Sequence, residues 1–234
     1  MEEMKIAVYD GEGTSPTLRP AFFPLTPRFL SAKELIEGNW DSDILIIPGG
    51  RDRPYDAALR GKGNDRIRSF VERGGLYIGL CAGAYYGCAK VIFDPGYPLE
   101  VIEDRELAFF PGAAVGPAYG LGTYDYKSNR GARATLLETE KSSLHCYYNG
   151  GCTFEGDFSR CHIIARYSDL PQKPPAIISC PVGRGHAILS GPHIETTFKL
   201  LNPNDPYLSK IIPTLKESES ARENLWSQLL SHSA

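Results

Sequence analysis

The sequence predicts an α/β fold in which a mostly parallel, open sheet carries helices on both faces. Three short apolar runs of strand type, residues 5–9, 43–48 and 76–78, alternate with helical patterns in the first part of the chain. Such alternation is typical of parallel sheets whose crossover connections are helices. After residue 130 the segments alternate apolar and polar residues instead, so we expect additional antiparallel strands in the second half.

The elements of the first half can be placed in order. After the first strand, Thr14 or Ser15 can cap a helix that has Pro16 in its first turn. A short strand at 28–30 precedes Ser31, which forms a capping-box pattern with Glu34 and predicts a short helix. The remaining predicted elements are helices at 54–59 and 63–72.

The second half is predicted to be rich in strands and to end in helices. We expect strands at 133–139, 144–148, 163–167, 176–182 and 185–190, with weaker candidates at 91–93 and 107–110. Helical patterns at 207–215 and 219–230 are interrupted by Pro213. The chain is therefore interpreted as a single domain over residues 1–234, with residues 205–234 as a helical C-terminal extension. Its late apolar stripe packs either on this domain or on a partner.

Composition excludes several classes of function. The 234 residues are 42% hydrophobic and 23% charged, with a net charge of −3, as in ordinary soluble globular proteins. No basic block is present, so neither nucleic acid nor a membrane is an expected partner. We expect a cytoplasmic protein because the N-terminus lacks a signal-peptide pattern. The six cysteines then favour reduced thiols, and their spacing predicts no metal site and no cofactor.

A candidate nucleophile lies directly after the strand at 76–78. The sequence Gly79-Leu-Cys-Ala-Gly83 has the Gly-x-nucleophile-x-Gly pattern of a nucleophile elbow between a strand and a helix. Such a turn lifts the central side chain, here that of Cys81, clear of the sheet and requires small neighbours. The alternative is that Cys81 is an ordinary buried thiol in a glycine-rich turn. A second cysteine, Cys88, follows seven residues later and is expected in the helix after the turn.

Two further segments supply the groups that a thiol nucleophile needs. Past the strand at 185–190, His193 and Glu195 are two residues apart, so an extended backbone projects them to the same side. They can act as base and orienting carboxylate. Pro48 precedes Gly49 and Gly50 at the end of the strand at 43–48, and their amides, with that of Ala82, could form an oxyanion hole.

These pieces, in this order, resemble the class I glutamine amidotransferase-like superfamily, which implies a flavodoxin-like sheet. More narrowly, the chain resembles the family of the biotin-protein ligase N-terminal domain over residues 4–200. The motifs that carry this are Pro48-Gly-Gly50, Gly79-Leu-Cys-Ala-Gly83, Tyr147-Tyr-Asn-Gly-Gly151, Gly183-Arg-Gly-His186 and Ser190-Gly-Pro-His-Ile-Glu195. The resemblance implies that Tyr148, Asn149 and Gly150 border the site; the residues alone predict only a hairpin.

Two features depart from these families. Most glutamine amidotransferases have Pro between His and Glu, where this chain has Ile194. The sequence also shows nothing like the biotin-activating loop of the ligases, so we expect no biotin transfer by this polypeptide.

The leading functional hypothesis is an amide-hydrolysing enzyme with a Cys81–His193–Glu195 triad and an unassigned small-molecule amide substrate. A protein partner could accept the ammonia released. The alternative is a non-catalytic small-molecule-binding or regulatory domain that retains the pocket. A redox or protease-like role fits less well, because Ala82 occupies the position where such relatives carry His. Further candidates for lining the pocket are Tyr119, Tyr124, Asp125 and Tyr126.

Overall fold

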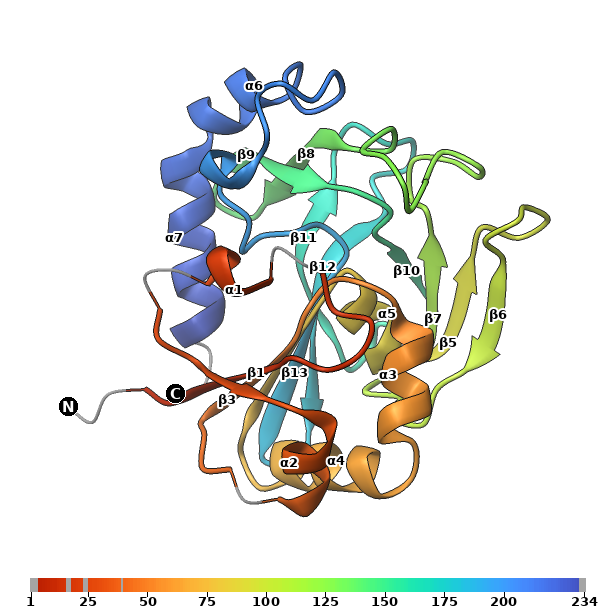
Figure 1. Ribbon diagram of the computed structural model, residues 1–234, viewed down its shortest axis with the longest axis vertical. Coiled ribbons are helices and arrows are strands. Elements are labelled where there is room, and N and C mark those ends of the chain that lie inside the picture. Colours follow the sequence, from red (N-terminus) through yellow and green to blue (C-terminus); the bar gives the residue numbers. More distant parts are fainter. Residues whose placement is uncertain (1–3, 16–17, 23–24, 39, 232–234) are drawn as a thin grey trace.

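The structure is a computed structural model that describes residues 4–15, 18–22, 25–38 and 40–231. The expected cap at Thr14 or Ser15 involves a helix start at residues 16 and 17, which lie outside this description. A nine-stranded sheet and a four-stranded sheet form the framework (Figure 1). The strand order of the large sheet is β2-β1-β3-β4-β13-β12-β11-β8-β9.

The large sheet has a parallel half and an antiparallel half, which confirms the predicted fold class. Its parallel strands are β2 (Arg28–Leu30), β1 (Ile6–Tyr9), β3 (Ile44–Ile47), β4 (Leu76–Leu80) and β13 (Gly185–Ser190). Its antiparallel strands are β12 (Pro175–Val182), β11 (His162–Tyr167), β8 (Arg133–Thr139) and β9 (Ser143–Tyr148). The central strands are wholly buried because helices cover both of their faces.

Helices lie on both faces of the parallel half (Figure 1). One face packs against α2 (Ala32–Glu37), α3 (Asp52–Leu59), α4 (Lys62–Glu72) and α5 (Ala82–Gly87). The capping box at Ser31 is present at the start of α2. The other face packs against α7 (Glu219–Leu230), close to Phe22, which follows α1 (Leu18–Ala21). Successive strand residues alternate between these two cores, as the pleat requires.

The second sheet contains β10 (Thr153–Glu155), β7 (Phe110–Gly116), β5 (Cys88–Phe93) and β6 (Val101–Asp104), and it lies at the right in Figure 1. The sequence indicated strand character in part of this region but not a separate sheet. The expectation that Cys88 lies in a helix was wrong. Helix α5 ends at Gly87, and Cys88 is the first residue of β5.

The C-terminal segment packs on the chain's own sheet. The apolar residues of α7 that enter the second core are Leu225, Trp226, Leu229 and Leu230. Pro213 begins rather than interrupts a helix: it lies in the first turn of α6 (Ile212–Glu217), where its missing N–H is not needed. A short 3-10 helix, Phe198–Leu200, precedes α6.

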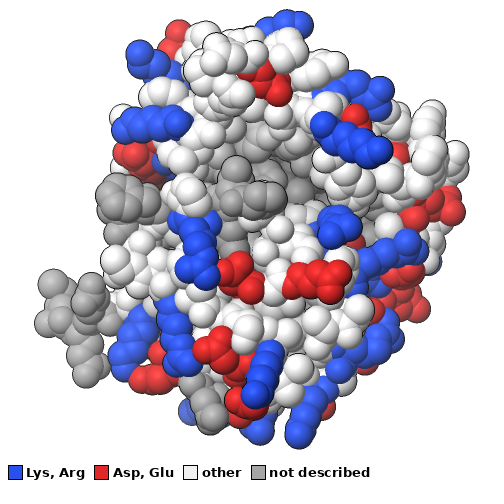
Figure 2. Space-filling view, in the orientation of Figure 1, with Lys and Arg blue, Asp and Glu red and all other residues white. Residues whose placement is uncertain are grey.

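Charges of both signs are mixed on one face of the molecule. Basic and acidic side chains are interspersed over the face in Figure 2, without a broad area of one sign. In the described part of the chain, the helices are too short or too polar to pass through a bilayer.

Candidate active site

Cys81 occupies a sharp turn between β4 and α5. Its backbone has φ 49° and ψ −103°, a conformation that L-residues adopt only under constraint. Its amide donates to the carbonyl of Ser190 over 2.8 Å, and the amide of Gly83 donates to that of Pro48 over 3.2 Å. A Cβ at Gly83 would run into the Ile47 carbonyl. The elbow is thus held between the two neighbouring strands, which explains the small residues around it.

The imidazole of His193 lies between the Cys81 thiol and a carboxylate. Its Nδ1 is 2.8 Å from Oε1 of Glu195, and its side chain also hydrogen-bonds to Cys81. The main chain holds it in place, because the His193 amide donates to the Tyr147 carbonyl over 2.8 Å. The structure therefore brings together the three residues that the sequence suggested as a triad, with the contacts of nucleophile to base and base to carboxylate.

The electrostatics of the site favour a protonated imidazole. Burial alone lowers the pKa of His193, but the negative charges of Glu195 and Cys81 outweigh it and raise the pKa well above the ordinary value. The second carboxylate oxygen of Glu195, Oε2, is buried without a hydrogen-bond partner. A cation beside Glu195 compensates the cost of burying that charge.

The Pro48-Gly-Gly50 turn lies against the imidazole. A Cβ at Gly49 would overlap the ring of His193, so only glycine permits this approach. The hydroxyl of Tyr55 donates to the Gly49 carbonyl over 3.0 Å. In the turns, loops and caps of the described residues, the amides of Gly50 and Ala82 donate to no carbonyl. Both residues line a pocket with Cys81, which makes their amides available to an oxyanion.

The triad opens into a cavity of about 430 Å³. Of the predicted site residues, it is lined by Gly49, Gly50, Cys81, Asn149, His193 and Glu195, together with Tyr124 and Tyr126. A second pocket of about 30 Å³ adjoins Cys81 and is lined by Ala82 and Gly150, with apolar walls from Val91, Phe93 and Val101. Cys81 borders both spaces, so its thiol lies where the two pockets adjoin.

Three suggested residues lie elsewhere. Tyr148 is buried in the core and donates its hydroxyl to the Gly151 carbonyl over 2.9 Å, while Tyr147 lines the cavity. Tyr119 borders a different cavity, near Arg133. The carboxylate of Asp125 accepts from the Lys127 amide over 3.0 Å and stabilises its own turn.

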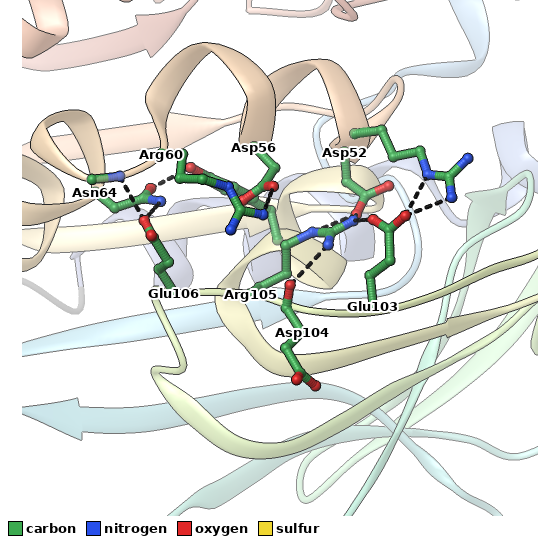
Figure 3. A network of polar contacts seen from close by, with 11 residues as sticks. Asp52, Asp56, Arg60, Asn64, Glu103, Asp104, Arg105 and Glu106 are labelled. Atoms are coloured by element: carbon green, nitrogen blue, oxygen red, sulfur yellow. Dashed lines mark hydrogen bonds and ion pairs between the residues drawn. The ribbon is translucent and has the colours of Figure 1, made fainter.

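An ion-pair network, which sequence reasoning missed, joins the start of α3 to the end of β6 and the residues just after it (Figure 3). Arg105 has a fully buried side chain and donates to Oδ2 of Asp52 from Nε over 3.0 Å and from Nη2 over 2.6 Å. Asp52 begins α3, two residues after Gly50. Burial raises the pKa of Asp52, and Arg105 opposes that shift. The guanidinium thereby fixes the start of α3, which follows the Pro48-Gly-Gly50 turn.

A second buried arginine supports the His-x-Glu segment. Arg222 of α7 donates from Nη1 to the carbonyl of Ile194 over 2.7 Å and pairs with Glu219 over 2.9 Å. Ile194 separates His193 from Glu195, so this contact fixes the backbone between base and carboxylate. In the sequence, Arg222 stands in a polar stretch and gives no signal of this role.

Four further thiols are buried away from the cavity of the candidate site. Burial raises the pKa of Cys88, Cys146, Cys152 and Cys180, which keeps them protonated. Within the described residues, no group of three or more His, Cys, Asp and Glu side chains is placed to hold a metal ion.

Comparison with known proteins identifies relatives over most of the chain. A family model described as "Biotin-protein ligase, N terminal" matches residues 4–234. An uncharacterized protein of Chlamydia muridarum (strain MoPn / Nigg) is 42% identical in an alignment 215 residues long, which covers 83% of this chain and 82% of that protein. The biotin–protein ligase of Schizosaccharomyces pombe is 36% identical in an alignment 210 residues long, which covers 82% of this chain but only 33% of the ligase.

Among solved structures, a crystal structure of a glutamine amidotransferase superposes with a TM-score of 0.60. The alignment covers 91% of this chain and 98% of that protein, at 22% sequence identity. This similarity shows a shared fold.

Proposed function

The chain belongs to the biotin-protein ligase N-terminal family, and from that premise we propose that it is an amide-hydrolysing enzyme of glutamine amidotransferase type. The nucleophile is Cys81, the base is His193 and the orienting carboxylate is Glu195. The observation that carries this proposal is the position of a single thiol at a strained elbow, beside a carboxylate-bound imidazole and at the wall of a cavity.

The reaction follows from this arrangement. The thiolate of Cys81 attacks the carboxamide carbon, and the amides of Gly50 and Ala82 bind the oxyanion. His193 then donates its proton to the departing nitrogen, which leaves as ammonia and gives a thioester on Cys81. A water molecule, deprotonated by His193, attacks the thioester, releases the carboxylic acid and restores the thiol.

The substrate class rests on the fold and on the shape of the pocket. Glutamine is the first candidate by analogy with the amidotransferase fold. A protein partner would receive the ammonia if the enzyme supplies a synthetase. A cytoplasmic location suits a thiol nucleophile, because thiols stay reduced there, and cell fractionation tests it.

The test is the rate of Cys81 alkylation as a function of pH, measured by peptide mass spectrometry. Cys81 should react far faster at neutral pH than the buried thiols of Cys88, Cys146 and Cys152. His193→Ala should slow it by at least about 10²-fold, the lower end of what a positioned acid–base group contributes. Thr196→Val is a matched control next to the triad, since the hydroxyl of Thr196 donates to Glu195 over a long 3.3 Å and so contributes little to holding the carboxylate.

Two results would overturn the proposal. One is a Cys81 thiol that alkylates as slowly as the buried thiols; the other is an alkylation rate that His193→Ala leaves unchanged. Either would favour the alternative of a non-catalytic domain that binds a small molecule in the same cavity. A fast thiol would be followed by ammonia release from a panel of carboxamides, with Cys81→Ala as the inactive control.

A further inference from the structure

A pair of cysteines lies far from Cys81: Cys180 is in β12, and Cys161 is the residue just before the neighbouring antiparallel strand β11. In the ladder of β11 and β12, His162 pairs with Ser179. Continued one step beyond the ladder, this register sets Cys161 opposite Cys180. The two Sγ atoms are 3.1 Å apart, although the residues are 19 positions apart in the sequence.

The backbone geometry suits a covalent bond between these two sulfurs. Directly opposed residues on antiparallel strands have Cα atoms about 4.5–5.5 Å apart. Disulfides join Cα atoms about 4.4–6.8 Å apart. A bond therefore requires the sulfurs to close by about 1 Å, to the usual length of about 2.05 Å, which side-chain rotation can supply without separating the strands.

The two thiols differ in exposure. Cys161 is partly exposed, whereas Cys180 is buried. Both line a cavity of about 260 Å³ that also contains the polar residues Asp157, Ser159 and Arg160. A small reagent can thus reach Cys161 from the cavity, and Cys180 lies behind it as the second thiol.

We propose that Cys161 and Cys180 are a reversible oxidation site that takes small disulfides such as glutathione disulfide. The Cys161 thiolate attacks one sulfur of the reagent, which forms a mixed disulfide and releases one glutathione thiolate. The Cys180 thiol then attacks the Cys161 sulfur, and its proton passes to the sulfur of the second glutathione as that group leaves. One disulfide reagent is reduced to two thiols, and the protein dithiol is oxidised to one disulfide.

This site is separate from the proposed catalytic centre. Cys180 pairs with Ala187, and Ala187 pairs with Tyr77 near the start of β4, whereas Cys81 follows the end of β4. Cys81 is four positions after Tyr77, or about 13 Å along the sheet. The oxidation site does not rest on the proposed amidase activity, and Cys81→Ser can serve as the background for its test.

The test treats the whole protein, as Cys81→Ser, with glutathione disulfide, then blocks free thiols and maps the peptides by mass spectrometry. We expect a cross-link between the peptides that contain Cys161 and Cys180, reversed by dithiothreitol. Cys180→Ala should stop at the glutathione adduct on Cys161, and Cys161→Ala should leave Cys180 as a free thiol. Cys152→Ala, which removes another buried thiol, should leave the cross-link intact.

The proposal is overturned if Cys161 and Cys180 both remain available to alkylation after treatment, or if either is found bonded to another cysteine. It is equally overturned if Cys180→Ala leaves Cys161 without the glutathione adduct. The mapping of the Cys81→Ser protein decides the matter even if the further substitutions impair folding. Alkylation of Cys81 in the wild-type protein is a separate measurement, so the two proposals can fail independently.

Discussion

Thiols lie in opposite chemical settings at the two ends of the central strands of the sheet. At the carboxyl end of β4, Cys81 stands alone with positive φ, beside the imidazole of His193 and the large cavity. Level with the amino end of β4, Cys180 of β12 faces the thiol of Cys161, the residue before β11. The first arrangement favours attack on an external carbonyl, and the second favours a bond within the protein.

The difference follows from the direction of the strands. Where parallel strands end, their loops and helix starts converge, so groups distant in sequence meet there without pairing. In the antiparallel part of the sheet, the ladder itself sets residues directly opposite each other. A cysteine therefore faces a ligand cavity at one end, whereas at the other end a cysteine faces a second cysteine.

The largest expected effect concerns the ion pair between Arg105 and Asp52, at the start of the helix that follows Gly50. Arg105→Met leaves the carboxylate of Asp52, 14% exposed, without its cation. Loss of one partner of a buried pair costs about 3–5 kcal/mol of the free energy of unfolding. Urea unfolding should show this loss, and alkylation of Cys81 should slow because the turn of Gly50 is less well held.

The double variant Arg105→Met, Asp52→Asn is the control. It removes the uncompensated charge, so it should recover a large part of the lost free energy of unfolding. In both variants the Cys161–Cys180 bond should still form, because Asp52 follows the carboxyl end of β3, whereas Cys180 pairs with Ala187, which is opposite Tyr77 near the start of β4. Equal destabilisation of the single and double variants would show that the ion pair is not the source of the effect.

Oxidation of the other end should stabilise the protein. In the chain-entropy model, a disulfide that closes a loop of about 15 residues contributes about 3 kcal/mol, and Cys161 and Cys180 are 19 positions apart. For chains of this size, 1 kcal/mol shifts the melting temperature by about 2–4 °C. Scanning calorimetry should therefore show a rise of several degrees after glutathione disulfide treatment, absent in Cys161→Ala. An unchanged or lower melting temperature would show strain in the oxidised ladder.

A smaller effect is expected at the His-x-Glu segment. Arg222→Met, made together with Glu219→Gln so that no carboxylate loses its cation, removes the hydrogen bond to the Ile194 carbonyl and leaves a buried acceptor unpaired, at a cost of about 1–3 kcal/mol. Cys81 alkylation should slow as well, because the backbone between base and carboxylate is released. Glu223→Gln is the matched control, since Glu223 is 60% exposed and its Oε1 is as far as 3.8 Å from Nη2 of Arg222, which makes this a weak contact. Equal rates in wild type and the double variant would assign Arg222 to stability alone.

The sequence predicted the parallel core and the triad because both depend on local pattern. Strands β1, β3 and β4 are continuous apolar runs, and the elbow needs small residues within two positions of Cys81. His193 and Glu195 follow a strand directly, so their place at its carboxyl end could be inferred from order alone.

What the sequence could not predict depends on contacts between distant residues. The four-stranded sheet was missed because β7 is short of large side chains and shows no period. Arg105 and Arg222 look like surface residues in the sequence, since nothing local marks a buried guanidinium. The pairing of Cys161 with Cys180 requires the β11–β12 register, which two strand-like segments alone do not determine.

The subtlest prediction is the response of the carboxyl end to pH. Because Glu195 and Cys81 raise the pKa of His193 against the effect of burial, Glu195→Gln should lower that pKa. A raised pKa in the folded state stabilises the protein fully below the unfolded value of about 6.5. This contribution is lost as pH rises through the folded pKa. The free energy of unfolding of the wild type should therefore exceed that of Glu195→Gln by the largest amount below pH 6.5. NMR titration of the His193 ring should show the lowered pKa of the variant directly. A His193 titration identical in the two proteins would mean that Glu195 does not hold the proton on the imidazole. The thiol of Cys81 would then lack a carboxylate-supported cation beside it, which is the feature that sets it apart from the Cys161–Cys180 pair.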